Sequence, residues 1–155
     1  MANVLDVAAY ILRAKGPMTA MKLQKLCYYA YSHHLAWEEE QLFPERFEAW
    51  ANGPVCRELY EIHRGRLQIR LGQVQQHGGK ASALNAGERE SVDLVLEAYG
   101  DLSAHQLSEM THAEAPWVKA RERAGAEPLD RSRERLLDAE IFEFFDALTS
   151  SDAEG

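Results

Sequence analysis

The 155-residue sequence contains only two cysteines, Cys27 and Cys56, and both fall in segments with helix-like apolar spacing. Two cysteines in a chain of this size do not make a disulfide framework, so we expect a reducing compartment. An uninterrupted apolar run of about 18 residues, the length that a membrane-spanning helix needs, is also missing. The stretch 1–16 carries Asp6 and lacks the basic start and cleavage site of a secretory signal. We therefore expect a cytoplasmic protein that does not span a membrane.

Positive charge is scarce as well. The chain has 17 lysines and arginines against 25 acidic residues, which gives a formal net charge of -8. Neutralising a phosphate backbone requires a concentrated basic face. The single basic cluster, residues 130–135, is interrupted by acids, which is typical of a solvated connection. The sequence therefore disfavours nucleic acid as a partner.

Motifs for metal, nucleotide or hydrolase chemistry are absent from the sequence, including CxxC, HExxH, GxGxxG, GxxxxGK[ST] and GxSxG. His33 and His34 are adjacent on an expected helix and point about 100° apart, so they do not share an ion. His105 and His112 lie two turns apart, so they need a ligand from a third element to bind one metal ion together. Cys27 lies on the apolar face of its expected helix, and a buried thiol is usually unreactive. We expect no metal, no cofactor and no catalytic residue.

Most of the chain shows the helix period, with apolar residues at i, i+3, i+4 and i+7. The predicted helices begin near Val4, Thr19, Pro54, Asn85, Ser103, Pro116 and Asp138. Asn85 and Ser103 each precede a Glu or Gln by three residues, as in a capping box, and Gly16 and Gly100 end helices. Pro54 is expected in the first turn of its helix, capped by Asn52 or Gly53, which would place Cys56 in that turn too.

The stretch 66–83 differs from the rest because Leu67, Ile69 and Leu71 alternate with polar residues and "HGGK" suits a turn. This pattern predicts a small β-hairpin around residues 66–83. The sequence thus predicts a mainly α, compact single-domain bundle of about six or seven helices over residues 1–149. Residues 150–155 are expected to form a flexible C-terminal tail.

Aromatic residues exceed what one helical core face absorbs: Tyr28, Tyr29, Tyr31, Trp37, Trp50, Tyr60, Tyr99 and Trp117. Exposed aromatic rings are frequent binding anchors, because they supply contact area at little entropic cost. The alternative is that these rings line a second contact between helices. We predict that a partner protein is bound by Tyr28, Tyr29, Trp37, Trp50 and Arg57.

The segment "MTHAEAPW", residues 110–117, is open to two interpretations. At the end of a helix, His112 can bond a free carbonyl while Pro116 fixes the exit and the Trp117 ring anchors it. We expect these three residues to form a structural lock. The alternative is an enzyme in which His112 acts with a neighbour, Thr111, Glu109 or Glu114.

Three blocks in order resemble the Panacea domain, the family that includes SocA-type antitoxins and GepA-like phage-associated proteins. They are "MTAMKLQKLCYYAY" (18–31), "FEAWANGPVCRELY" (47–60) and "YGDLSAHQLSEMTHAEAPWVKAR" (99–121), and the closing "IFEFF" helix also fits. The sequence departs from the family pattern at Cys27, where an aliphatic residue is more frequent, and in the polar "CREL" after Gly-Pro-Val.

The resemblance implies a mostly helical antitoxin that neutralises a cognate toxin by binding it directly. For SocA-like members it implies a different mechanism, in which the protein is a proteolytic adaptor that delivers the toxin to the ClpXP protease. The acidic run Glu38 to Glu40 would steer a basic toxin, since complementary charge chiefly raises association rates. The oligomeric state is left open.

Overall fold

The computed structural model describes the backbone of residues 1–154 and the side chains of residues 1–150. In this part of the chain 62% of the residues are helical, which confirms the prediction of a mainly α fold. The eight α-helices are α1 (Val4–Lys15), α2 (Ala20–Glu38), α3 (Arg57–His63), α4 (Leu71–Gln76), α5 (Ala86–Tyr99), α6 (Ala104–His112), α7 (Ala115–Ala124) and α8 (Asp138–Glu154). A short 3₁₀ helix, η1 (Ala81–Ala83), precedes α5.

Two antiparallel sheets of two strands complete the described fold. One pairs β1 (Met18–Thr19) with β4 (Gln68–Ile69), and the other pairs β2 (Phe47–Trp50) with β3 (Gly53–Cys56). Most of the expected tail, residues 150–155, lies outside the described side chains. No helix in the described residues is long and apolar enough to cross a membrane.

The predicted helix ends are confirmed where they depend on local chemistry. The Thr19 hydroxyl accepts a hydrogen bond from the Lys22 backbone N–H at 3.2 Å, which caps α2. Asn85 and Ser103 close complete capping boxes at the starts of α5 and α6. These contacts satisfy backbone donors that a helix start would otherwise leave unpaired.

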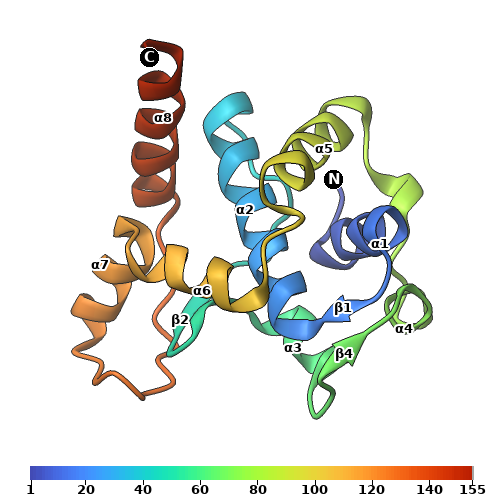
Figure 1. The fold of residues 1–155 in the computed structure, drawn as a ribbon, viewed down its shortest axis with the longest axis horizontal. Helices are drawn as coiled ribbons and strands as arrows, with labels where there is room; N and C mark the ends of the chain where they lie inside the picture. Colours follow the sequence, from blue (N-terminus) through green and yellow to red (C-terminus); the bar gives the residue numbers. More distant parts are fainter. Residues whose placement is uncertain (155) are drawn as a thin grey trace.

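Helix α2 lies at the centre of the fold, with α8 on one side and α5 on the other (Figure 1). Helices α1 and α6 also pack against it, so residues from Leu23 to Ala36 are buried around its whole circumference. Polar side chains on α2 are therefore buried too, and each needs a hydrogen-bond partner inside the protein. This requirement connects α2 to the hairpin described below.

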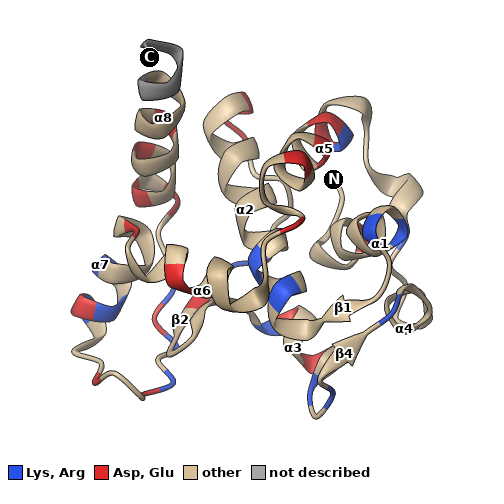
Figure 2. Cartoon of the chain, viewed as in Figure 1, with Lys and Arg blue, Asp and Glu red and all other residues tan. Residues whose placement is uncertain are grey.

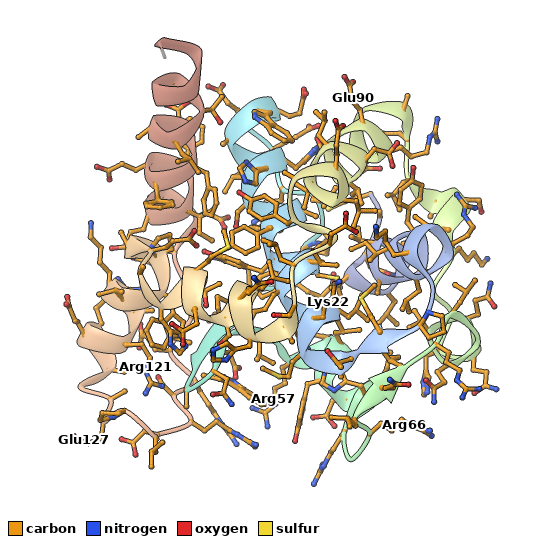
Figure 3. The ribbon with its side chains drawn as sticks, viewed as in Figure 1. Lys22, Arg57, Arg66, Glu90, Arg121 and Glu127 are labelled. Carbon is orange, nitrogen blue, oxygen red and sulfur yellow. The ribbon has the colours of Figure 1, made fainter. Side chains whose placement is uncertain are left out.

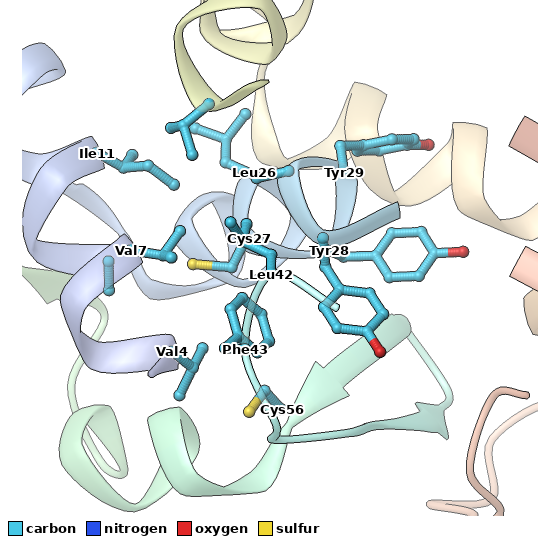
Figure 4. Packing of buried hydrophobic residues seen from close by; sticks show 14 of the residues in the cluster. Val4, Val7, Ile11, Leu26, Cys27, Tyr28, Tyr29, Leu42, Phe43 and Cys56 are labelled. Carbon is cyan, nitrogen blue, oxygen red and sulfur yellow. The ribbon is translucent and has the colours of Figure 1, made fainter. Parts of the chain in front are cut away.

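Tyr28 and Tyr29 lie inside the hydrophobic core, so the expectation that their rings face a partner is wrong. Both are fully buried, and Figure 4 shows them among the apolar side chains that surround α2. Tyr29 stacks on Tyr99 at 4.4 Å between ring centroids, and Tyr28 meets Phe47 edge-on at 5.3 Å. A helix with neighbours on every side has no outer face, and this is why the single apolar stripe misled the prediction.

The hairpin predicted for residues 66–83 does not form there. Gln68 and Ile69 pair with β1, and the Leu67 carbonyl accepts from the Ala20 backbone N–H at 2.9 Å. Leu71 then begins α4, where the Gln73 side chain accepts from the Arg70 N–H at 2.8 Å. The alternating pattern thus marks one short strand whose partner is distant in sequence.

The observed hairpin is formed by β2 and β3, with Ala51 and Asn52 in the turn. Pro54 lies in β3 instead of opening a helix, and α3 begins only at Arg57 with Cys56 as its N-cap residue. The expectation that Pro54 lies in the first turn of a helix is therefore wrong, since the helix begins three residues later.

Candidate functional site

Two buried polar side chains of α2 fix the β2–β3 hairpin to the core. The Gln24 amide donates to the Cys56 carbonyl at 3.0 Å and accepts from the Cys56 N–H at 2.8 Å, so it pairs with β3 as a neighbouring strand would. The Lys25 ammonium donates to the Pro54 carbonyl at 3.2 Å. The position of the hairpin is thus set by adjacent residues of one helix.

Gly53 allows the hairpin to approach Lys25 closely. Its φ of +116° lies in a region that residues with a Cβ rarely adopt. A Cβ at this position would lie 2.6 Å from Lys25 Cε and 2.7 Å from the Thr111 hydroxyl. A larger residue here would force the buried side chains of Lys25 or Thr111 to move.

Burial shifts the pKa values of several groups below the hairpin. Desolvation lowers the pKa of Lys25 to about 7, and no carboxylate forms an ion pair with its ammonium among the described side chains. Burial raises the pKa of Glu114 to about 7, although the Tyr29 hydroxyl donates to that carboxylate at 2.9 Å. Burial also raises the thiol pKa of Cys56, which is the N-cap residue of α3 and not part of its first turn. Of these groups, Lys25 contacts the hairpin and Cys56 belongs to it.

A groove surrounds the hairpin turn on both sides, and we call it the hairpin groove. One half has a volume of about 320 Å³ and is lined by Trp50, Tyr60, Arg131 and neighbouring residues. The other half has about 480 Å³ and contains His112 and Trp117. Ala51, Asn52 and Leu129 line both halves, so the two cavities adjoin across the turn.

Arg131 and Leu129 are the most available side chains of the hairpin groove. The Arg131 guanidinium lies 4.3 Å from the Trp50 ring centroid and 5.6 Å from that of Tyr60. It forms no hydrogen bond or ion pair within the described residues, so its donors are open to a ligand. Leu129 is 93% exposed, which is unusual for a large apolar side chain.

Trp50 and Arg57, two of the predicted partner-binding residues, meet through Glu48. The Trp50 indole N–H donates to the Glu48 carboxylate at 2.7 Å, and Arg57 lies 3.7 Å from the same group. Trp50 is buried apart from the ring edge that lines the groove, whereas the Arg57 side chain is 38% exposed. Figure 3 shows Arg57 and Arg121 on opposite sides of β2.

His112, Pro116 and Trp117 lie where α6 joins α7, beside the hairpin. The His112 ring stacks on Trp117 at 4.2 Å with an interplanar angle of 15°, and the Trp117 indole donates to the Trp50 carbonyl at 2.9 Å. Pro116 is buried in the first turn of α7. These contacts tie the junction to the hairpin, and the role of the three residues as a lock stays a prediction.

The residues of the alternative enzyme interpretation point to different partners. The Thr111 hydroxyl donates to the Ser108 carbonyl, Glu114 accepts from Tyr29, and Glu109 lies 3.6 Å from His105. Among the described side chains, none of these groups is hydrogen-bonded to His112. The described residues also contain no group of three or more His, Cys, Asp or Glu that could hold a metal ion.

Replacing His112 with alanine tests the lock. We expect the free energy of unfolding to fall by about 1–2 kcal/mol, because a stacked aromatic pair and its buried area are lost. Urea denaturation measures this change. Exposed His105 on the same helix provides the control, and His105→Ala should change stability by less than about 0.5 kcal/mol. Equal effects of the two substitutions would contradict the lock.

The structure separates the predicted partner-binding residues into three places. Trp50 lines the hairpin groove, and Arg57 lies next to it through Glu48 without lining the groove. Tyr28 and Tyr29 lie in the core, and Trp37 lies in a different groove between α2, α5 and α8. Sequence reasoning missed Leu129 and Arg131. Arg131 falls in the basic cluster 130–135 that was interpreted as a solvated connection, and Leu129 immediately precedes that cluster.

A mainly helical fold with an exposed groove lined by rings and a free guanidinium is typical of proteins that bind other proteins. A family model described as "Antitoxin SocA-like, Panacea domain" matches residues 23–118. The match extends from α2 through the hairpin to Val118 in α7, so the chain belongs to the SocA-like Panacea antitoxin family. No curated protein matches the chain. No solved structure matches it either.

Proposed function

We propose that the protein is an antitoxin that neutralises a cognate toxin by binding it directly through the hairpin groove. Membership of the SocA-like family carries the antitoxin part of this proposal. The matched residues include the hairpin, His112 and Trp117, and so contain most of one half of the groove and part of the other. Both cysteines are free and buried, which supports a reducing compartment such as the cytoplasm.

The chemistry of the groove supports a particular kind of partner segment. The rings of Trp50 and Tyr60 offer an apolar wall, and exposed Leu129 extends it. The unpaired Arg131 guanidinium above these rings is suited to a carboxylate, with which it can form two parallel hydrogen bonds. The groove therefore fits a toxin segment that carries an apolar side chain next to an acidic group.

Charge reversal in the groove tests this proposal. In cells that express the toxin encoded beside this chain, wild-type protein should restore growth and co-elute with the toxin. The double variant Leu129→Asp/Arg131→Glu should weaken binding by roughly 100-fold, because it removes an apolar anchor and repels the acidic group. Both side chains are exposed, so we expect the melting temperature to be unchanged.

The matched control is Arg66→Glu/Leu67→Asp, which makes the same change in charge and polarity on the loop before β4. Leu67 is 80% exposed, and neither residue lines the hairpin groove. Wild-type protein that neither binds the toxin nor restores growth would refute the antitoxin proposal. If it binds but the two double variants behave alike, the groove is not the contact site.

Toxin abundance separates direct neutralisation from the adaptor mechanism. Under our proposal, the toxin stays stable in a pulse-chase experiment while its activity is blocked. Toxin that disappears only in cells with ClpXP would instead support delivery to the protease. Both mechanisms require the toxin to be bound, so the variants above apply to either.

A further inference from the structure

A second groove lies on the other side of the molecule from the hairpin turn, with α2 as its floor and α5 and α8 as its walls. Helices α5 and α8 flank α2 without packing tightly against each other (Figure 1). The cavity between them has a volume of about 280 Å³. Its lining includes Trp37 from α2, Leu94 and Ala98 from α5, and Leu148 from α8.

This groove is apolar and open to solvent. Leu94 is 45% exposed and Leu148 is 36% exposed, so two of the six exposed large apolar residues in the described chain face each other across it. Trp37 contributes a half-buried ring between them. Its volume lies below that of cavities for drug-sized ligands, and it suits one or two anchoring side chains of a protein.

The parts of α2, α5 and α8 that lie around the groove carry mostly negative charge, whereas Lys22 and Lys25 lie in the first half of α2, away from it. In residues 33–40, 86–99 and 138–150, Arg89 is the only lysine or arginine. Its guanidinium donates to the Leu84 carbonyl at the start of α5. Figure 2 shows acidic residues on α5 and α8, whereas the basic residues lie mostly elsewhere, on α1, the first half of α2, α3 and α7, and near α4.

Four exposed carboxylates surround the apolar lining. Glu90 and Glu97 are at i-4 and i+3 from Leu94, so they are its neighbours on the surface of α5. Glu38 and Glu39 follow Trp37 at the end of α2. None of the four forms a salt bridge in the part of the chain whose side chains are described.

We propose that the α2/α5/α8 groove binds a basic amphipathic helix of a partner protein. A helix that lies in a groove inserts apolar side chains at i, i+3 or i+4 and i+7, and its polar face meets the rim. Leu94, Trp37 and Leu148 receive the apolar anchors, and the unpaired carboxylates of the rim receive lysines or arginines. The same negative rim repels nucleic acid and anionic lipid surfaces.

This inference goes beyond the proposed function, because it concerns a surface separate from the hairpin groove. Its test therefore uses no toxin. The probe is a synthetic amphipathic helix of roughly 18 residues, or five turns, built from leucine and lysine. A peptide with the same pattern of leucine and glutamate is the comparison. The full chain is labelled with nitrogen-15 and titrated at about 0.15 M salt, where surface charges are screened beyond about 8 Å.

The three tryptophans report where the peptide binds. The indole N–H signal of Trp37 lies in the α2/α5/α8 groove, whereas Trp50 and Trp117 line the hairpin groove. We expect saturable shifts of the Trp37 signal with the leucine–lysine peptide and none with the leucine–glutamate peptide. The Trp50 and Trp117 signals should stay in place.

The double variant Glu90→Lys/Glu97→Lys should weaken binding of the lysine peptide by roughly tenfold or more, because it replaces two rim carboxylates by repelling charges. The matched control is Glu143→Lys/Asp146→Lys, which makes the same charge change on exposed positions of α8. These positions lie about 140° and 160° around α8 from Leu148, on its outer face. The control should bind nearly as well as wild type.

Three results would overturn the proposal: no saturable binding, equal binding of both peptides, or equal losses in the two double variants. Shifts at Trp50 and Trp117 in place of Trp37 would also overturn it. None of these outcomes affects the antitoxin proposal, since the toxin experiment depends on Leu129 and Arg131. Conversely, a chain that fails to neutralise its toxin can still bind the lysine peptide.

Discussion

Replacing Gly53 with alanine is expected to lower the free energy of unfolding by about 3 kcal/mol. Two costs add at this position. A residue with a Cβ at φ +116° is strained by about 1–2 kcal/mol, and overpacking a buried contact costs a further 1–3 kcal/mol. The methyl group would press on Lys25 Cε and on the Thr111 hydroxyl, which come from two different helices. Urea denaturation of both proteins at one pH measures the difference.

Gly65 provides the control for this substitution. Its φ is +80°, and a Cβ there would have no heavy atom within 4 Å. Gly65→Ala therefore carries only the backbone cost, and we expect a loss of about 1 kcal/mol. Similar losses at the two glycines would show that the close approach of the hairpin to α2 and α6 contributes little to stability.

The Gly53 contact illustrates which features could be predicted from sequence. The glycine and proline showed that the chain turns near residues 52–54, because these residues have narrow backbone preferences. The following element was not evident, because Gln24 and Lys25 determine it from α2, far away in sequence. Capping boxes at Asn85 and Ser103 were predictable for the opposite reason, since all their atoms lie within four residues.

Burial explains the wrong predictions for the aromatic residues. The assumption for α2 was one buried face, so Tyr28 and Tyr29 were assigned to the surface. Four other helices surround α2, and both rings became core. Trp37 lies near the C-terminal end of the helix and is only partly buried, and its role in binding a partner stays a prediction. The number of neighbours around a helix is a tertiary property that its own sequence specifies poorly.

The hairpin groove was predictable only in part. Of its lining residues, Trp50 was predicted to bind a partner, whereas His112 and Trp117 were predicted only as parts of the structural lock. Leu129 and Arg131 come from a loop without periodicity, and they reach Trp50 only because the chain returns along β2. The Leu136 backbone N–H, for example, donates to the Phe47 carbonyl at 3.0 Å. Pairing between such distant segments leaves no local pattern in the sequence.

Replacing Lys25 with methionine is expected to stabilise the protein at neutral pH, because wild-type Lys25 is fully buried without a carboxylate partner. Its pKa is lowered from 10.5 to about 7, so folding must largely neutralise the amine at pH 8. Because folding lowers the pKa of Lys25, its contribution to the free energy of unfolding is complete above pH 10.5 and is lost as the pH falls to about 7. Wild-type stability from this group therefore rises with pH across that window.

The expected gain of Lys25→Met is about 2 kcal/mol at pH 7, after a loss for leaving the Pro54 carbonyl without its donor. The gain should decrease by about 1.4 kcal/mol per pH unit and nearly vanish at pH 8.5. The series ends at pH 8.5. Burial raises the thiol pKa values of Cys27 and Cys56, so the contribution of these thiols to the free energy of unfolding decreases as the pH rises to about 9 and above. Glu114, whose pKa is raised to about 7, loses its contribution between about 4.5 and 7, so the series begins at pH 7.

Lys119→Met is the control, because Lys119 is exposed on α7 and makes no hydrogen bond or ion pair in the described chain. Urea curves at pH 7, 7.5, 8 and 8.5 compare both variants with wild type. The difference between Lys25→Met and wild type mainly reports Lys25 at these pH values. Burial lowers the pKa values of His63 and His112, and the Lys25 charge lowers them as well, so both rings titrate below this pH range. If that difference does not change with pH, Lys25 stays charged in the folded state. The ammonium would then have to be solvated or paired within the core, and Gly53 would accommodate a charged group instead of a neutral amine.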